Sequence, residues 1–174
     1  MPGMGMVGRN FLAWHRQFLL VFERRLGVAV PHWDWARDRA IPPALTGSGL
    51  LRRWGVSRAP VFNAGLLPSS QSVRVVGQAA SFEVFQASLE AVHNLPHHAV
   101  GGTMNTASSP ADPVFWLHHA NIDRIWAAWQ KTRPAAGPVN ATERLKPRSV
   151  FGMTMFGMAV SDVLDVAALG YRYV

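Results

Sequence analysis

The sequence predicts a mainly α-helical fold. Three segments, residues 11–27, 81–95 and 112–131, place apolar side chains on one face at helical spacing. The length of 174 residues suits a single domain, 1–174, with one core. Because 49% of the residues are hydrophobic and only 16% are charged, the chain can bury such a core and is not a disordered tail.

Residues 11–27 form the first expected helix. Five of its apolar side chains lie within about 60° of His15 when residues are spaced 100° apart around the axis. They are Phe11, Phe18, Leu19, Phe22 and Leu26. Arg16 and Gln17 fall outside this face, and Gly27 is expected to end the helix. His15 is therefore expected in the middle of an apolar face.

Residues 36–80 form a variable region that follows the pentapeptide PHWDW (residues 31–35). Prolines and glycines recur throughout it, and Pro68 is followed by two serines, which is a turn signal. The region is therefore expected to be irregular, with at most one short helix or hairpin.

The second expected helix, residues 81–95, carries a mixed face. This face comprises Phe82, Gln86, Leu89, Glu90 and His93. His97 belongs to it only if the helix continues beyond Pro96, which lacks a backbone donor and disfavours helical geometry at Leu95. A kink or an altered last turn is expected between His93 and His97, before the glycines at 101–102.

The third expected helix has the clearest start. Asp112 is a good N-cap, and proline is favoured at the first helical position, here residue 113. The helix is expected to run to about Lys131, with Phe115, His119, Ile122, Asp123 and Trp126 on one face. His118 is expected to point aside from that face. Residues 161–169 fit one more short helix.

Composition excludes several classes of protein. Without cysteine, the chain has no disulfide and no thiolate metal site. Its apolar stretches are shorter than a membrane span, and its start does not resemble a signal peptide, so no localisation is predicted. The net charge of +7 comes from basic residues scattered along the chain, which disfavours nucleic-acid binding.

Histidines on inward faces are the candidate functional residues. A single buried histidine is usually structural, and the i, i+4 pair His93 and His97 is by itself a weak metal signal. However, His15 and His119 occupy the apolar faces of the other two helices. Four neutral imidazoles in one interior would be costly without a metal ion. Nitrogen ligands without cysteine or clustered carboxylates favour copper or zinc.

Several segments together resemble the tyrosinase family of type-3 copper proteins. FLAWHRQFLLVFE (11–23) resembles its first copper motif, and DPVFWLHHANID (112–123) matches every defining position of its second. PHWDW resembles the family's PYWDW, LEAVHNLPHHAVGGTM (89–104) its LE…HN..H…GG.M segment, and LGYRY (169–173) its closing Tyr-x-Tyr. The resemblance implies a four-helix-bundle type-3 copper fold with long irregular loops and two copper ions.

The resemblance also assigns the copper ligands. It gives the second copper His93, His97 and His119. His15 matches one ligand of the first copper, but Gly5 or Met6 stands where the family has another histidine, and a further ligand belongs to an upstream helix. The first bundle helix is therefore expected to be missing. The faces that carry His15 and His119 are then expected to form an exposed apolar patch.

The implied activity is that of a copper-containing oxidoreductase, a monophenol or diphenol oxidase. The family oxidises phenols and o-diphenols to o-quinones with dioxygen. Asn94 matches the asparagine that helps to hold a phenol-deprotonating water in hydroxylating members, and Glu90 aligns with its partner. An ordinary helix-surface carboxylate is the alternative for Glu90. Asp123 is expected either to support the site or the pairing of helices, or to form an ordinary ion pair with an arginine.

Other functions and partners stay open. With one of three ligands for the first copper, the chain is alternatively a non-catalytic or mononuclear copper-binding remnant. Dioxygen transport, as in the related hemocyanins, is disfavoured by the small size and by Asn94. The implied partners are a phenolic substrate and dioxygen, and a helper protein or a second copy of the chain. The sequence does not decide between monophenol and diphenol.

Overall fold

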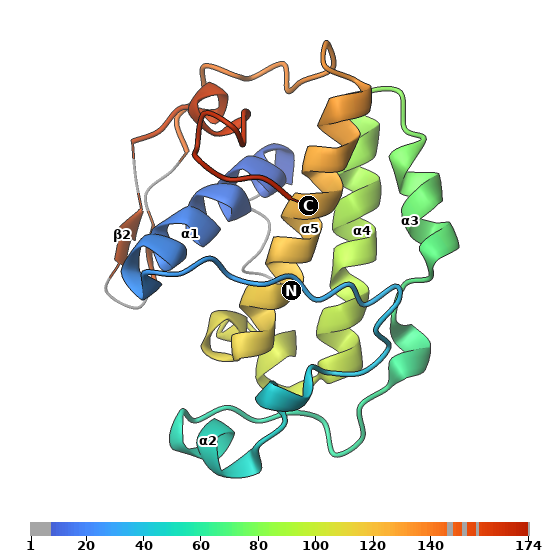
Figure 1. Cartoon of the computed structure of the whole chain (residues 1–174), viewed down its shortest axis with the longest axis vertical. Helices are drawn as coiled ribbons and strands as arrows, with labels where there is room; N and C mark the ends of the chain where they lie inside the picture. The colour runs from blue at the N-terminus through green and yellow to red at the C-terminus, as the bar shows by residue number, and fades with distance from the viewer. Residues whose placement is uncertain (1–7, 146–147, 151–152, 156, 174) are drawn as a thin grey trace.

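A bundle of helices forms most of the molecule (Figure 1). The computed structural model describes residues 8–145, 148–150, 153–155 and 157–173. The longest helices are α1 (Phe11–Leu26), α3 (Ser70–Gly77), α4 (Phe82–Val100) and α5 (Pro113–Thr132). Helices α4 and α5 run side by side, α1 crosses them, and α3 packs against α4 and α5 (Figure 1). The predicted mainly α bundle is thus confirmed.

Shorter elements connect and flank these helices. They are η1 (Gly8–Asn10), η2 (Pro43–Leu45), α2 (Ser48–Arg53), η3 (Ala64–Leu66), η4 (Gly102–Asn105), η5 (Ser109–Ala111) and η6 (Val160–Val163). The strands β1 (Arg148–Val150) and β2 (Met153–Met155) form an antiparallel hairpin in which Ser149 pairs with Thr154. The sequence did not predict this hairpin. In place of the short helix expected at 161–169, the structure has the single 3-10 turn η6.

The ends of α1 and α5 agree with the predicted ones. Gly27 follows α1 in the left-handed conformation, with φ of 77°, and its N–H donates to the carbonyl of Glu23. The side chain of Asp112 accepts the N–H of Val114 at 2.9 Å and so caps α5, with proline as the first helical residue. Local capping chemistry therefore fixed both boundaries.

Helix α4 is longer than predicted. It starts after the N-cap Ser81 and continues through Pro96 to Val100. Proline removes only its own backbone bond, and burial of Pro96 and Val100 against the rest of the bundle favours the continued helix. His97 therefore lies on the same helix as His93, one turn further on.

The variable region is more ordered than predicted, since it contains two helices, α2 and α3. The turn signal at Pro68 also starts a helix, because the side chain of Ser69 accepts the N–H of Ser72 at 3.1 Å. Val76 then buries itself against the bundle. The expectation of at most one short helix was wrong because the same residues serve as turn and as cap.

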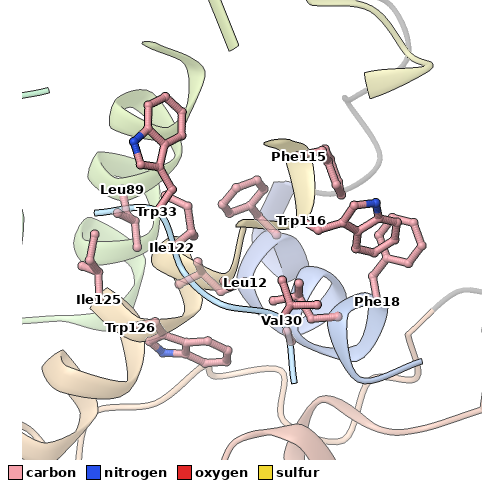
Figure 2. Close-up of a cluster of buried hydrophobic side chains, with 14 of the residues drawn as sticks. Leu12, Phe18, Val30, Trp33, Leu89, Phe115, Trp116, Ile122, Ile125 and Trp126 are labelled. Carbon is pink, nitrogen blue, oxygen red and sulfur yellow. The ribbon is translucent and has the colours of Figure 1, made fainter. Parts of the chain in front are cut away.

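The core lies between α1, α4 and α5. Figure 2 shows Leu12 and Phe18 from α1, Leu89 from α4 and Ile122 from α5 among its buried side chains.

None of the helices in the described part of the chain combines the length and apolarity that crossing a membrane requires.

The apolar patch expected around His15 and His119 is not exposed. His15 is 7% exposed and His119 is 1% exposed. The two rings stack on each other with centroids 4.2 Å apart, and Phe11 and Phe115 pack against them. These faces of α1 and α5 therefore cover one another, which the prediction did not consider.

A buried ion pair joins α1, α5 and the C-terminal segment. Arg16, predicted to lie outside the apolar face, is 1% exposed and its Nε donates to Oδ1 of Asp123 at 2.6 Å. The hydroxyls of Tyr171 and Tyr173 donate to Oδ2 of the same carboxylate at 2.7 and 2.8 Å. The ion pair expected as one alternative for Asp123 is present, and because Arg16 lies on α1 it also joins two helices.

Candidate metal centre

Four histidines from α4 and α5 gather in the interior. We call His93, His97, His118 and His119 the histidine cluster; each offers a ring nitrogen within 4.8 Å of the others. All four are buried, with at most 5% of their surface exposed. Helix α4 contributes the pair one turn apart, and α5 contributes the adjacent pair.

Three Nε2 atoms of the cluster converge. Nε2 of His93 lies 3.0 Å from Nε2 of His97 and 3.2 Å from Nε2 of His119. Two nitrogens bound at about 2.0–2.1 Å to one tetrahedral ion lie about 3.3–3.4 Å apart. The three imidazoles that the family resemblance assigns to the second copper are thus slightly closer together than a shared ion would hold them.

Hydrogen bonding orients His97 for metal binding. Its Nδ1 lies 2.6 Å from the carbonyl oxygen of Met104, which can only accept, so Nδ1 carries the proton. In the neutral ring, Nε2 then carries the lone pair. This backbone anchoring of the distal nitrogen is typical of metal-ligating histidines.

Burial keeps the cluster neutral. It lowers the pKa of His97 to about 4 and depresses the pKa values of His93, His118 and His119 well below their usual range, and the neighbouring imidazoles reinforce this for the last three. The Nδ1 atoms of His93 and His119 and Nε2 of His118 have no hydrogen-bond partner. A neutral imidazole has a lone pair to offer a copper ion, so the neutral rings whose Nε2 atoms converge fit one.

His15 lies beside the cluster rather than within it. Its ring stacks on that of His119 and lies 6.0 Å from that of His93, centroid to centroid. Its Nδ1 donates to the carbonyl of Phe11 at 2.8 Å, the same anchoring as in His97. The group of close ligand atoms identified in the described ranges does not include His15. Gly5 and Met6, the expected positions of another ligand, lie outside the described residues.

His118 is the cluster member that sequence reasoning misplaced. It was expected to point aside from the face of His119, yet it is fully buried and its ring centroid lies 5.0 Å from that of His119. Helix α5 is buried on nearly all sides, as the burial of Trp116, Ala120 and Asn121 shows. Apolar residues occur on all sides of α5, and this pattern in the sequence could have predicted that His118 is buried as well.

Glu90 and Asn94 lie on α4, three residues before and one residue after His93, and both are half-buried. Burial raises the pKa of Glu90. Its side chain lines a surface pocket of about 240 Å³ together with Glu83, Gln86 and Asn140, among other residues. The side chain of Asn94 raises the pKa of His93 by hydrogen bonding, but burial lowers that pKa by more. Within the described residues no hydrogen bond links Glu90 to Asn94.

Comparison with known proteins gives the family. Residues 7–61 and 58–132 match the model of the common central domain of tyrosinase. The chain is 36% identical to the tyrosinase of Streptomyces antibioticus over 73% of its own length and 64% of that protein, so it spans less than two thirds of that relative. It is 30% identical to hemocyanin 2 of Megathura crenulata over 70% of its length and 4% of that protein.

The fold comparison agrees with the sequence comparison. A functional unit of octopus hemocyanin superposes with a TM-score of 0.74 at 25% sequence identity, over 95% of this chain and 52% of that one. Matches to both tyrosinases and hemocyanins, on a fold that buries four histidines between two helices, have one consistent explanation. The chain belongs to the tyrosinase family and carries its type-3 copper domain.

Proposed function

We propose that the chain is a copper-dependent oxidase that converts phenols or o-diphenols to o-quinones with dioxygen. The observation that carries the proposal is the convergence of the Nε2 atoms of His93, His97 and His119 in a buried site. The tyrosinase relatives support copper as the ion and oxidation as the reaction. Copper, when bound, supplies a redox centre that cycles between Cu(I) and Cu(II) with dioxygen as the oxidant.

The ligand histidines contribute orientation and a dry environment. His97 holds its proton on Nδ1 against Met104, which leaves Nε2 to face the metal. Burial of all three proposed ligands excludes bulk water and keeps their rings neutral, so they bind without competition from protons near neutral pH.

We assign proton transfer to Glu90 with Asn94. They lie four residues apart on α4, on one side of the helix and next to His93. The raised pKa of Glu90 makes its carboxylate a better base than a fully exposed one. In this proposal, Glu90 accepts the phenol proton through a water molecule that Asn94 orients.

A copper-binding domain without oxidase activity is the second candidate. Across the described residues, ligand side chains close enough to share an ion form a single group, and His15 is not part of it. Such a domain would bind one copper, through His93, His97 and His119. The hemocyanin relatives make reversible dioxygen binding a further outcome of the same test.

Copper stoichiometry and quinone formation test these candidates together. The purified chain is loaded with copper, and bound metal is measured alongside oxidation of catechol and tyrosine. We expect His119→Asn to lose bound copper and at least about 99% of catechol oxidation, because one of three nitrogen ligands is removed. The control His32→Asn replaces an exposed histidine and should match the unmodified chain.

Each outcome separates the candidates. Copper binding with catechol turnover supports the oxidase. One copper per chain without turnover supports the non-catalytic domain, and reversible dioxygen uptake without turnover supports a carrier. Glu90→Gln should lower tyrosine oxidation about 100-fold and catechol oxidation much less, since catechol depends less on a base. Failure to bind copper contradicts all three candidates.

A further inference from the structure

The histidine cluster contains one imidazole more than the three proposed ligands. The ring centroid of His118 lies 5.0 Å from those of His93, His97 and His119 alike. Its burial and distance would therefore qualify it as a fourth ligand. Four protein nitrogens would close a tetrahedral site, as in structural metal centres, whereas catalytic sites keep one position open.

A hydrogen bond distinguishes His118 from the other members of the cluster. The indole Nε1–H of Trp35 donates to Nδ1 of His118 at 3.1 Å, and both residues are fully buried. Because an indole nitrogen can only donate, Nδ1 of His118 carries the lone pair, and the proton of the neutral ring lies on Nε2. His97 has the opposite arrangement, with its proton on Nδ1 against Met104.

Each nitrogen of His118 is therefore blocked as a ligand. Nδ1 is occupied by Trp35, and Nε2 bears the proton. To bind an ion through Nε2, His118 would have to move its proton to Nδ1, where it would face the N–H of Trp35. Two buried donors, Nδ1–H of His118 and the indole N–H of Trp35, would then oppose each other without an acceptor, whereas in the present tautomer only Nε2–H of His118 lacks one.

Trp35 is held so that it cannot turn away easily. Next to it, the backbone N–H of Trp33 donates to the carbonyl of Leu117 at 3.0 Å. Asp34 forms an ion pair with Arg124 of α5 at 3.1 Å. Both neighbours of Trp35 are thus attached to the helix that carries His118, and the indole is enclosed by the core.

We propose that the Trp35–His118 hydrogen bond excludes His118 from the metal and so keeps one coordination position open for an external molecule. Trp35 and His118 are positioning residues in this account, and the inference rests on the proposed metal site formed by His93, His97 and His119. The PHWDW segment thereby takes part in the centre without contacting the ion.

Trp35→Phe tests the inference, because it removes the N–H and keeps an aromatic ring. The protein is loaded with one equivalent of Cu(II). Pulsed electron paramagnetic resonance then counts the bound imidazoles, and azide titration reports the open position. We expect three imidazoles in the unmodified chain and four in Trp35→Phe. Azide affinity should fall at least about tenfold in the variant, since a protein nitrogen occupies the open position.

Two further variants serve as controls. Trp33→Phe removes a neighbouring indole that donates to the carbonyl of Asp38 and not to a histidine, so it should match the unmodified chain. Trp35→Phe combined with His118→Asn should restore three imidazoles and azide binding. If Trp35→Phe binds azide like the unmodified chain, with three imidazoles, the inference is wrong although the metal site stands.

The tautomer of His118 gives a test that needs no variant to fold. Nitrogen-15 NMR of the metal-free protein should show that Nε2 of His118 is protonated and Nδ1 is not. A proton on Nδ1 would overturn the inference. If the unmodified chain binds no Cu(II), both the proposed function and this inference fail. If the unmodified chain binds Cu(II) through four imidazoles, only this inference fails.

Discussion

At the scale of single residues, the buried histidines make stability depend on pH. Burial lowers the pKa of His97 to about 4, and His93, His118 and His119 shift in the same direction. Above about pH 6.5 these histidines are neutral in both the folded and the unfolded chain, so they add no pH dependence. Below it, the unfolded chain binds protons that the folded chain refuses.

The metal-free protein should therefore lose stability as the pH falls through about 6.5. Each buried histidine lowers the free energy of unfolding by up to about 1.4 kcal/mol per pH unit. Urea unfolding between about pH 7.5 and pH 5.5 measures the slope, in a range where most carboxylates stay charged. His97→Asn should reduce the slope, because asparagine does not titrate in this range. A stability that stays constant or rises on acidification would contradict this.

The residue scale also shows how far the sequence predicts the candidate site. Helical spacing alone placed His93 and His119 on inward faces, and it placed His97 there only if the helix continued past Pro96. The structure brings these three together. The position of His118 was wrong because a residue beside a helix face is buried or exposed according to what packs there. That packing comes from Trp35, distant in sequence by 83 residues, and no local pattern encodes it.

At the scale of elements, Gly101 and Gly102 at the end of α4 pack closely against residues 57–59 of the variable region. Gly102 has a φ of 53°, and a Cβ there would lie 2.4 Å from the carbonyl oxygen of Ser57. Backbone cannot yield as a flexible side chain does, so two costs add: the left-handed conformation and the clash.

Gly102→Ala should therefore lower the free energy of unfolding by about 2–4 kcal/mol. Chemical denaturation with both variants in parallel is the measurement. The control Gly77→Ala lies at the end of α3 with open space around it and no positive φ, and should raise stability by up to about 1 kcal/mol. Equal effects of the two substitutions would show that the close approach to Ser57 does not matter.

The elements also differ in how well the sequence predicts them. Helices α1 and α5 have an apolar face and a recognisable cap or stop, so their ends were predicted within a residue or so. Pro96 argued for an early end to α4, but packing of the last turn outweighed that local preference. In the variable region, Ser69 reads equally as turn and cap, and only the contact of Val76 with the bundle decides between them.

At the scale of the whole molecule, Asp123 connects three parts of the chain. Its carboxylate pairs with Arg16 of α1 and accepts the hydroxyls of Tyr171 and Tyr173. Burial and the charge of Asp123 raise the pKa of both tyrosines, so their hydroxyls stay protonated and donate. Arg16 also donates to the carbonyl of Val163, which extends the network into the segment before the tyrosines.

Asp123→Asn should lower the free energy of unfolding by about 3–5 kcal/mol, because it leaves the buried charge of Arg16 without its partner. Tyr173→Phe should cost about 1.5–3 kcal/mol, as expected for a hydrogen bond to a charged group. The double variant should lose less free energy of unfolding than the sum of the two single losses, since the hydroxyl of Tyr173 makes only a weak hydrogen bond to an uncharged amide. Urea unfolding of the four proteins gives this coupling directly.

The control for this network is the ion pair of Arg37 with Asp34, whose arginine side chain is 83% exposed at a separation of 3.9 Å. Arg37→Ala should change the free energy of unfolding by no more than about 0.5 kcal/mol, because solvent screens such pairs. If Asp123→Asn proved as mild as Arg37→Ala, the buried network would not hold the C-terminal segment on the bundle. Strict additivity of Asp123→Asn and Tyr173→Phe would likewise show that the two residues act separately, whatever their distance.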